Sequence, residues 1–284
     1  MRLHSTLFLF IFVWASFLNA QPNTEIYLFD LIKDGNQYRV ANPINVSNQN
    51  PGYDNQPHFT ADGNLLYTGT ANGNTEVILY DLSTSKSKNL SQSLANEYSP
   101  TPIPNGMGFS CIYDTTQNLV QYSYKNHEDT TILIDNAVVG YHAWLNHQNL
   151  VLFALGSPNT LQLYHLPTKT ATVVDSTIGR SLHKIPSTSN FSYVDKKVVP
   201  FMVTTRDFDG NNSTAIIALP EGVEDIIWSP NAELFSSNGS SLIMADMSAQ
   251  NWVKIADLSD YGLSGITRLS INPNGDKIAI VVNE

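Results

Sequence analysis

The feature that most limits how this chain can fold is a repeat with a period of 41 to 43 residues. In each unit an apolar residue or a proline stands three residues before a turn-type or small polar residue. These anchors are Phe59, Pro102, Trp144, Ile185, Trp228 and Ile271. Self-similarity with a period near 40 residues is typical of the blades of a β-propeller, which pack one against the next. Six anchors therefore predict six blades.

Each unit contains several short runs of strand-forming residues. In the clearest unit these runs span residues 55–59, 64–69, 75–81 and 86–90. The third run is rich in β-branched and aromatic side chains, as expected for a half-buried strand. Its equivalents are expected at 119–124, 161–166, 198–205 and 241–247. Three units carry the Asx-Gly turn of a tight hairpin, at Asp62-Gly63, Asn105-Gly106 and Asn274-Gly275. The sequence thus predicts an all-β fold.

The two ends of the chain predict how the ring closes. After the anchor Ile271 only one further strand is expected, at 277–282, so this unit lacks its third and fourth strands. Two strand-like runs near the N-terminus, 25–30 and 38–46, belong to no anchored unit, and the first closely resembles 76–81. We therefore predict a six-bladed β-propeller whose N- and C-terminal strands share one blade. This arrangement leaves no open sheet edge that could pair with other molecules.

Several of these units resemble a known family. Residues 56–67 (QPHFTADGNLLY), followed by 76–82, resemble the WD-like (WD40-like) repeat of TolB-type propellers, in which a Ser-Pro-Asp-Gly turn joins the first two strands. The segments 228–231 (WSPN) and 271–275 (INPNG) carry a similar turn, whereas the units around Trp144 and Ile185 lack it. The resemblance implies a periplasmic or otherwise exported protein whose role is protein binding.

The first 20 residues have the pattern of a cleaved signal peptide. Arg2 precedes an apolar run over 7–18, and small or polar residues follow up to Ala20. The run is shorter than the roughly 20 apolar residues of a membrane-spanning helix, although a retained anchor is the alternative. We predict cleavage near Ala20, a single propeller domain over residues 21–284 without a transmembrane segment, and a periplasmic or secreted location.

Charge and cysteine content exclude other classes. The chain has 15 basic and 25 acidic residues and a net charge of −10, which disfavours a nucleic-acid partner because phosphate binding needs a basic patch. Cys111 is the only cysteine, so no internal disulfide can form. We interpret it as a small apolar residue inside a strand. We expect a monomer without a cofactor.

A candidate ligand site follows from the propeller geometry. Propellers usually bind at the mouth of the central channel, where the first strand of each blade and its preceding loop present side chains. Aligning the units on their anchors places these residues there: Asp54, Gln56, His58, Glu97, Tyr98, Tyr141, His142, Arg180, His183, Glu224, Asp225 and Arg268. Such a group could bind a peptide terminus, a sugar or a metal ion. Alternatively, its members pair across the channel and hold water.

Two patterns raise the question of a metal. His142 and His183 occupy equivalent positions in adjacent units, and Glu97 or Glu224 could supply a third ligand. Residues 207–212 (DFDGNN) place oxygen ligands at alternate positions, as calcium loops do, but lack the late glutamate of such loops. We interpret this segment as a hairpin turn. Without a compact ligand motif, the sequence predicts no bound metal.

The sequence carries no complete catalytic signature. The segment 262–265 (GLSG) is one residue short of the Gly-x-Ser-x-Gly elbow of hydrolases, and it precedes a strand instead of a helix. The leading hypothesis is an exported, non-enzymatic propeller that binds a protein, a peptide or a small ligand at its channel mouth. The alternative is a metal-dependent hydrolase of the lactonase or phytase type, because such sites use scattered carboxylates that no local motif would reveal.

Overall fold

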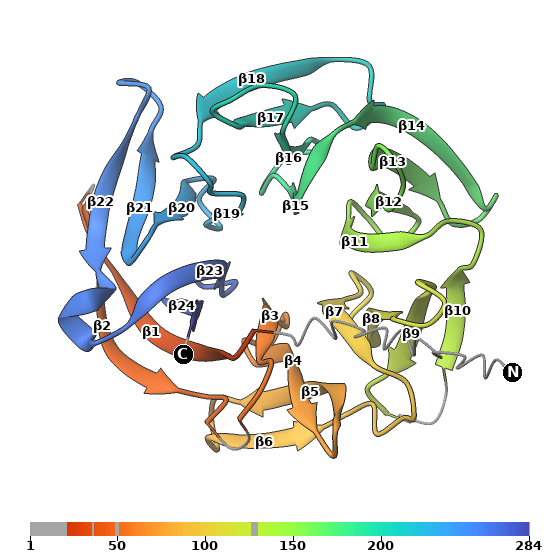
Figure 1. Cartoon of the computed structure of the whole chain (residues 1–284), viewed down its shortest axis with the longest axis horizontal. Helices are drawn as coiled ribbons and strands as arrows, with labels where there is room; N and C mark the ends of the chain where they lie inside the picture. Colours follow the sequence, from red (N-terminus) through yellow and green to blue (C-terminus); the bar gives the residue numbers. More distant parts are fainter. Residues whose placement is uncertain (1–21, 36, 49–50, 126–129, 284) are drawn as a thin grey trace, which may run out of the picture.

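A computed structural model describes residues 22–35, 37–48, 51–125 and 130–283. These residues form six four-stranded antiparallel sheets arranged as blades around a central channel (Figure 1). The prediction of an all-β six-bladed propeller is confirmed. The signal peptide predicted over residues 1–20 lies outside the described residues. No helix among the described residues has the length and apolar character needed to cross a membrane.

The strands follow one another from the channel outward in the first five blades. Blade 1 holds β3 (Asn55–Phe59), β4 (Leu65–Ala71), β5 (Asn74–Asp81) and β6 (Lys86–Asn89). Blade 2 holds β7 (Glu97–Pro102), β8 (Gly108–Tyr113), β9 (Leu119–Ser123) and β10 (Thr130–Ile134). Blade 3 holds β11 (Val139–Trp144), β12 (Asn149–Ala154), β13 (Thr160–His165) and β14 (Thr170–Ser176). Blade 4 holds β15 (Ile178–Lys184), β16 (Phe191–Asp195), β17 (Met202–Arg206) and β18 (Ser213–Ala218). Blade 5 holds β19 (Ile226–Trp228), β20 (Leu234–Asn238), β21 (Ser241–Asp246) and β22 (Asn251–Asp257), and a 3-10 turn, η1 (Leu258–Tyr261), follows it.

Blade 6 joins the two ends of the chain, as predicted. Its strands are β23 (Ser264–Ile271), β24 (Lys277–Asn283), β1 (Thr24–Asp34) and β2 (Gln37–Asn45), in the spatial order β2-β1-β24-β23. Glu25 stands opposite Val282 and Asp30 opposite Lys277 in an antiparallel register. The Lys277 ammonium also pairs with the Asp30 carboxylate. The ring is therefore closed by backbone hydrogen bonds between segments about as far apart as the sequence allows.

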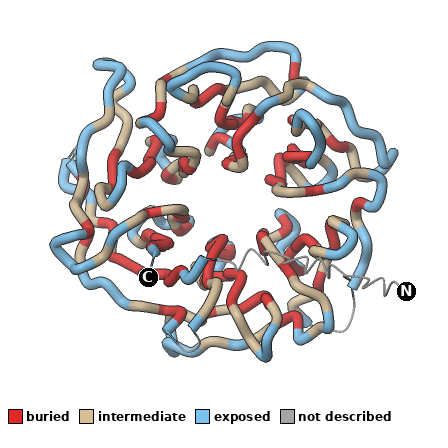
Figure 2. Tube along the Cα trace, in the orientation of Figure 1, coloured by how far each residue is buried: buried red, intermediate tan, exposed pale blue. Residues whose placement is uncertain are grey.

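The core lies between neighbouring blades, and the exposed residues gather on the outer rim (Figure 2). Tyr38 of blade 6 and Phe235 of blade 5 illustrate such an interface, because their ring centroids are 5.2 Å apart in an edge-on arrangement. Burying one ring of this kind stabilises the fold by about 2 kcal/mol. The anchors take part in the same interfaces. The indole Nε1 atoms of Trp144 and Trp228 donate to serines of the preceding blade, Ser110 and Ser192, both at 2.9 Å.

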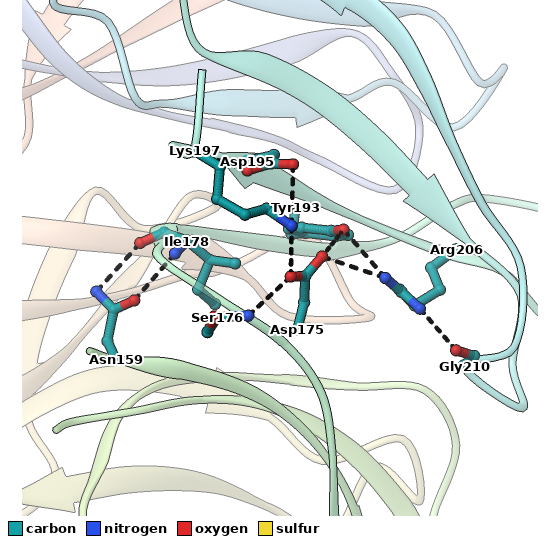
Figure 3. A network of polar contacts seen from close by, with 9 residues as sticks. All are labelled: Asn159, Asp175, Ser176, Ile178, Tyr193, Asp195, Lys197, Arg206 and Gly210. Atoms are coloured by element: carbon teal, nitrogen blue, oxygen red, sulfur yellow. Dashed lines mark hydrogen bonds and ion pairs between the residues drawn. The ribbon is translucent and has the colours of Figure 1, made fainter. Parts of the chain in front are cut away.

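A polar network joins blades 3 and 4 (Figure 3). The Asp175 carboxylate, on β14, accepts hydrogen bonds from the Tyr193 hydroxyl at 2.5 Å and from the Arg206 guanidinium at 3.2 Å. The Lys197 ammonium lies 2.6 Å from the same carboxylate. Nearby, the side chain of Asn159 both donates to and accepts from the backbone of Ile178. This network is a structural connection between two sheets, far from any sequence motif.

Local expectations are confirmed, with most strand ends within one or two residues of their predicted positions and one strand start shifted further. Cys111 is buried inside β8, and burial raises the pKa of its thiol well above its ordinary value. Residues 207–212 form the turn between β17 and β18, in which Asp207 accepts from the backbone N–H of Asn211 at 2.8 Å. The strand expected at 198–205 begins only at Met202. Pro200 has no N–H to donate, which is consistent with the later start.

Candidate ligand site in the central channel

The inner strands β3, β7, β11, β15, β19 and β23 surround the channel (Figure 1). Five of them have an irregular register beside it. The shifts fall at Asn55/His58, Tyr98/Thr101, Val139/Tyr141, Ile178/Leu182 and Ser264/Arg268. Within two of these bulges, Gln56 and Ser99 have positive φ angles of 57° and 54°. A bulge bends its strand and redirects a side chain, so these irregularities decide which residues reach the channel.

The channel contains a cavity of about 80 Å³. Eight of the residues predicted for the ligand site line it: Gln56, His58, Tyr141, His142, Arg180, His183, Asp225 and Arg268. The cavity is also lined by Ser99, Thr101 and Ser181. We did not predict Thr101 or Ser181. Thr101 was detectable, because it stands one residue before its anchor, as His58 does.

Four residues predicted for the site lie outside this cavity. Asp54 accepts from the backbone N–H of Thr70 at 3.3 Å, and Tyr98 packs edge-on against Tyr53. Glu224 forms an ion pair with Lys196 at 2.5 Å and lines an adjoining cavity of about 330 Å³. Asp54 precedes β3, and Glu97 and Tyr98 lie at the start of β7, so a register shift separates all three from their anchors. Counting back from the anchor therefore does not give their orientation.

Glu97, the fourth of these residues, belongs to the interface between blades 1 and 2. Its side chain is fully buried, and one carboxylate oxygen accepts from the hydroxyls of Ser93 and Tyr122. The other oxygen, Oε2, has no hydrogen-bond partner within the described ranges. Burial, with a smaller contribution from the nearby Glu76 carboxylate, raises the pKa of Glu97 to about 7. It is therefore a buried carboxyl without a cation.

The three histidines of the cavity are neutral. Burial lowers the pKa of His142 and of His183 to about 3. Desolvation by the surrounding protein lowers the pKa of His58 to about 4. His142 Nε2 lies 2.7 Å from Ser110 Oγ, and His183 Nε2 lies 3.0 Å from Ser181 Oγ. Neutral rings of this kind can donate or accept hydrogen bonds but contribute no charge.

The metal alternative required a third ligand beside His142 and His183. Both candidates for that role, Glu97 and Glu224, lie outside the cavity. Within the described part of the chain, no three His, Cys, Asp or Glu side chains are grouped so that they could hold a metal ion.

The charged groups of the cavity are Arg180, Arg268 and Asp225. Asp225 Oδ2 accepts from the backbone N–H of Leu269 at 2.9 Å, and Oδ1 lies 4.0 Å from the Arg268 guanidinium. Burial raises the pKa of Asp225 to about 6, although both arginines oppose this shift. Arg268 donates to the Tyr141 hydroxyl at 3.0 Å and stands 5.0 Å from the centre of its ring. Arg180 donates to the backbone carbonyl of Thr267 at 3.3 Å.

Two of the predicted site residues connect neighbouring blades. Gln56 Oε1 accepts from the backbone N–H of Ser99 at 2.7 Å, and Asp225 makes the equivalent kind of contact with Leu269. Both residues stand three positions before their anchors. The alternative, in which the channel side chains form hydrogen bonds and ion pairs with one another, therefore holds for part of this site. It does not hold for Arg180.

Comparisons with known proteins show the fold and leave the activity open. No protein-family model and no curated protein matches the chain. Among solved structures, a protein of Agrobacterium tumefaciens assigned to TolB is 12% identical, with a TM-score of 0.66 over 93% of this chain and 99% of its own. A gluconolactonase of Xanthomonas campestris is 8% identical, with a TM-score of 0.64 over 94% of this chain and 99% of its own. An oligogalacturonate lyase in complex with manganese is 16% identical, with a TM-score of 0.56 over 90% of this chain and 78% of its own. The six-bladed fold is thus shared by TolB-type proteins and by enzymes.

Proposed function

We propose that this protein is an exported propeller that binds a protein or peptide at the mouth of its channel and performs no chemistry. The observation that supports this proposal is the character of the cavity. Its polar side chains present hydrogen-bond donors and acceptors and a pair of guanidinium groups, as ligand sites on rigid scaffolds do. The resemblance to TolB-type propellers is consistent with export and with a protein partner.

The serine–histidine contacts of the site argue for binding over hydrolysis. Ser110 contacts His142, but the serine is fully buried and its hydroxyl also accepts from Trp144. Among the residues that the structure describes, His142 Nδ1 has no partner, so no third group there orients the ring as in a catalytic triad. A histidine with a pKa of about 3 is also a weak general base at neutral pH. Ser110 and His142 therefore act as packing and hydrogen-bonding groups.

Peptide selection tests the proposal. A random peptide library displayed on phage would be selected on the purified mature protein and the recovered peptides synthesised for calorimetry. We expect micromolar binders whose affinity falls at least tenfold in Tyr141→Ala, which removes a side chain of the cavity. Tyr261→Ala is the matched control, because Tyr261 lies on the outer surface, donates to Val40 and is 41% exposed. Equal losses in both variants, or no selectable peptide, would contradict channel binding.

The rival activity can be tested with the same protein. The wild type and His183→Ala would be assayed against a chromogenic lactone and a phosphate ester, with and without added Ca²⁺ and Mn²⁺. We expect no turnover in any combination. A metal-dependent rate that disappears in His183→Ala would establish the hydrolase instead. Cell fractionation with N-terminal sequencing tests export, and we expect the mature chain to begin near Gln21.

A further inference from the structure

The second arginine of the cavity lacks an anionic partner. Among the described residues, Arg180 takes part in no ion pair, and its one hydrogen bond goes to the Thr267 carbonyl at 3.3 Å. A guanidinium group carries five N–H donors. Its Nε is buried without a hydrogen-bond partner in the described part of the chain, and so is the neighbouring Thr267 Oγ1. Most of the donors of Arg180 are therefore unused within the protein.

The cavity carries an excess of positive charge although the whole chain is acidic. Arg180 and Arg268 line it together with a single carboxylate, Asp225. The histidines are neutral, and Glu97 is outside the cavity. Glu224 lines the adjoining cavity together with Arg180, but its charge is paired with that of Lys196. The arginines act on the same surroundings, because both stabilise the charged form of Asp225 and of Tyr53. With Asp225 ionised, the sum is one positive charge, in a chain whose net charge is −10. Such a site attracts a monoanion.

The size of the cavity limits what can enter. The cavity is small, at about 80 Å³, so we expect only a small terminal group of a ligand, such as a carboxylate, to enter it. The ligand must then present its charged group at an end or on a protruding side chain. A phosphate dianion would exceed the single positive charge available, whereas a carboxylate matches it. Arginine also binds the two oxygens of a carboxylate in a planar, two-bond arrangement.

We propose that the channel cavity binds the terminal carboxylate of a peptide, which Arg180 of blade 4 contacts directly and which Arg268 of blade 6, held by Tyr141 and Asp225, supports. This inference rests on the proposed function, since it names the group by which the bound peptide is recognised. Ser99 lines the same cavity, and its Oγ is buried without a partner among the residues that the structure covers, so it is a further donor for that carboxylate.

A pair of small probes tests the inference. N-acetyl-trialanine with a free carboxylate and its C-terminal amide differ only in the proposed group. We expect the free acid to bind the wild-type protein at least tenfold more tightly than the amide in titrations followed by NMR. Arg180→Gln should remove this preference, and Arg180→Lys should restore part of it. Arg39→Gln is the matched control, because Arg39 is an exposed residue on β2, and it should keep the full preference. Thermal melting of each variant verifies that it is folded.

The outcomes separate this inference from the proposed function. Library peptides that bind the channel equally well as acids and as amides would overturn the carboxylate inference and leave the binding function standing. Failure of the library and of both probes would overturn both. Inorganic phosphate that binds more tightly than acetate would overturn the choice of a monoanion. Galacturonate that binds while the free-acid peptide does not would overturn the peptide as the source of the carboxylate.

Discussion

Two arginines of blade 4 stand in opposite situations. Arg206, on β17, lies 3.2 Å from the Asp175 carboxylate, donates to the Gly210 carbonyl at 2.7 Å and stands 5.9 Å from the centre of the Tyr193 ring (Figure 3). Arg180, on β15, has one weak hydrogen bond and no carboxylate within ion-pair distance among the described residues. Both leave Nε without a partner, so the difference lies in the counter-ion.

This difference separates a structural arginine from one available to a ligand. A partly buried charge that meets a carboxylate and an aromatic ring is satisfied by the fold, and its removal damages the fold. A charge in a channel without such a partner contributes little to folding and is available to an anion. The carboxyl groups show the same contrast, because Asp175 meets two cations whereas Glu97 meets none.

The largest effect on stability is expected when the polar network between blades 3 and 4 loses its central carboxylate. Asp175→Asn removes the charge that Arg206 and Lys197 share, and both cations then remain in a partly buried site without a partner. We expect the free energy of unfolding to fall by about 3 kcal/mol. Urea unfolding followed by fluorescence measures it. Asp209→Asn, at an exposed position of the β17–β18 turn in blade 4, is the control and should be nearly neutral. A loss below about 1 kcal/mol would show that the network is not structural.

The comparison also explains what the sequence could and could not predict. The period of the anchors and the likeness of residues 25–30 to 76–81 predicted the six blades and the closure of blade 6. Short stretches of sequence were enough for this, because each one contains the pattern of its own strands and of the residues that pack between blades. The channel was predicted in part. Gln56 and Ser99 adopt positive φ angles, a conformation that neither residue type favours. The bulges therefore had no signature, and Glu97 and Tyr98 were placed in the channel although they lie outside the cavity.

The sequence also could not predict which charged side chains have a counter-ion. Asp175 and Arg206 are 31 positions apart on different blades, and nothing in the local sequence pairs them. The local sequence does not distinguish Arg180 from Arg206, so only the structure shows which of the two has a carboxylate partner. The same holds for Glu97, whose lack of a cation decides its pKa.

Lowering the pH should separate the two kinds of carboxyl group. The pKa of Glu97 is raised from 4.5 to about 7, so the folded state holds its proton more tightly than the unfolded state. This group therefore favours folding below pH 4.5, and its contribution is lost as the pH rises to about 7. Asp175 behaves in the opposite way. Burial opposes ionisation, but Lys197 and Tyr193 lower its pKa, so its contribution is lost when the pH falls below about 4.

Glu97→Gln tests this assignment. The amide cannot ionise, so the variant should exceed the wild type in stability by about 2 kcal/mol at pH 8 and match it at about pH 4. Urea midpoints at several pH values provide the measurement. Glu221→Gln, at an exposed loop position, should follow the wild type at every pH. A variant that is less stable than the wild type at pH 8 would show that Glu97 is ionised and satisfied in the fold.

A smaller effect is expected at the edge of the network. The Lys197 ammonium pairs with Asp175 at 2.6 Å and with Asp195 at 3.4 Å, but its side chain is 44% exposed. Water screens such a pair, so Lys197→Ala should cost only about 0.5 kcal/mol in the free energy of unfolding. The effect should shrink further in 1 M salt, because the screening length then falls to about 3 Å. A cost close to that of Asp175→Asn would place the centre of the network at Lys197 instead of Arg206.

The smallest effect on stability should come from Arg180, although it is the residue expected to matter most for binding. Arg180→Gln removes a charge that the fold does not neutralise, and a glutamine amide can keep the hydrogen bond to the Thr267 carbonyl. We expect a change within about 0.5 kcal/mol, while Arg206→Gln should cost clearly more because it leaves Asp175 with one cation fewer. Urea unfolding of the two variants side by side decides the point. Equal losses in the free energy of unfolding would show that Arg180 stabilises the fold as much as Arg206 does. Arg180 would then not be a channel arginine that is available to bind a ligand.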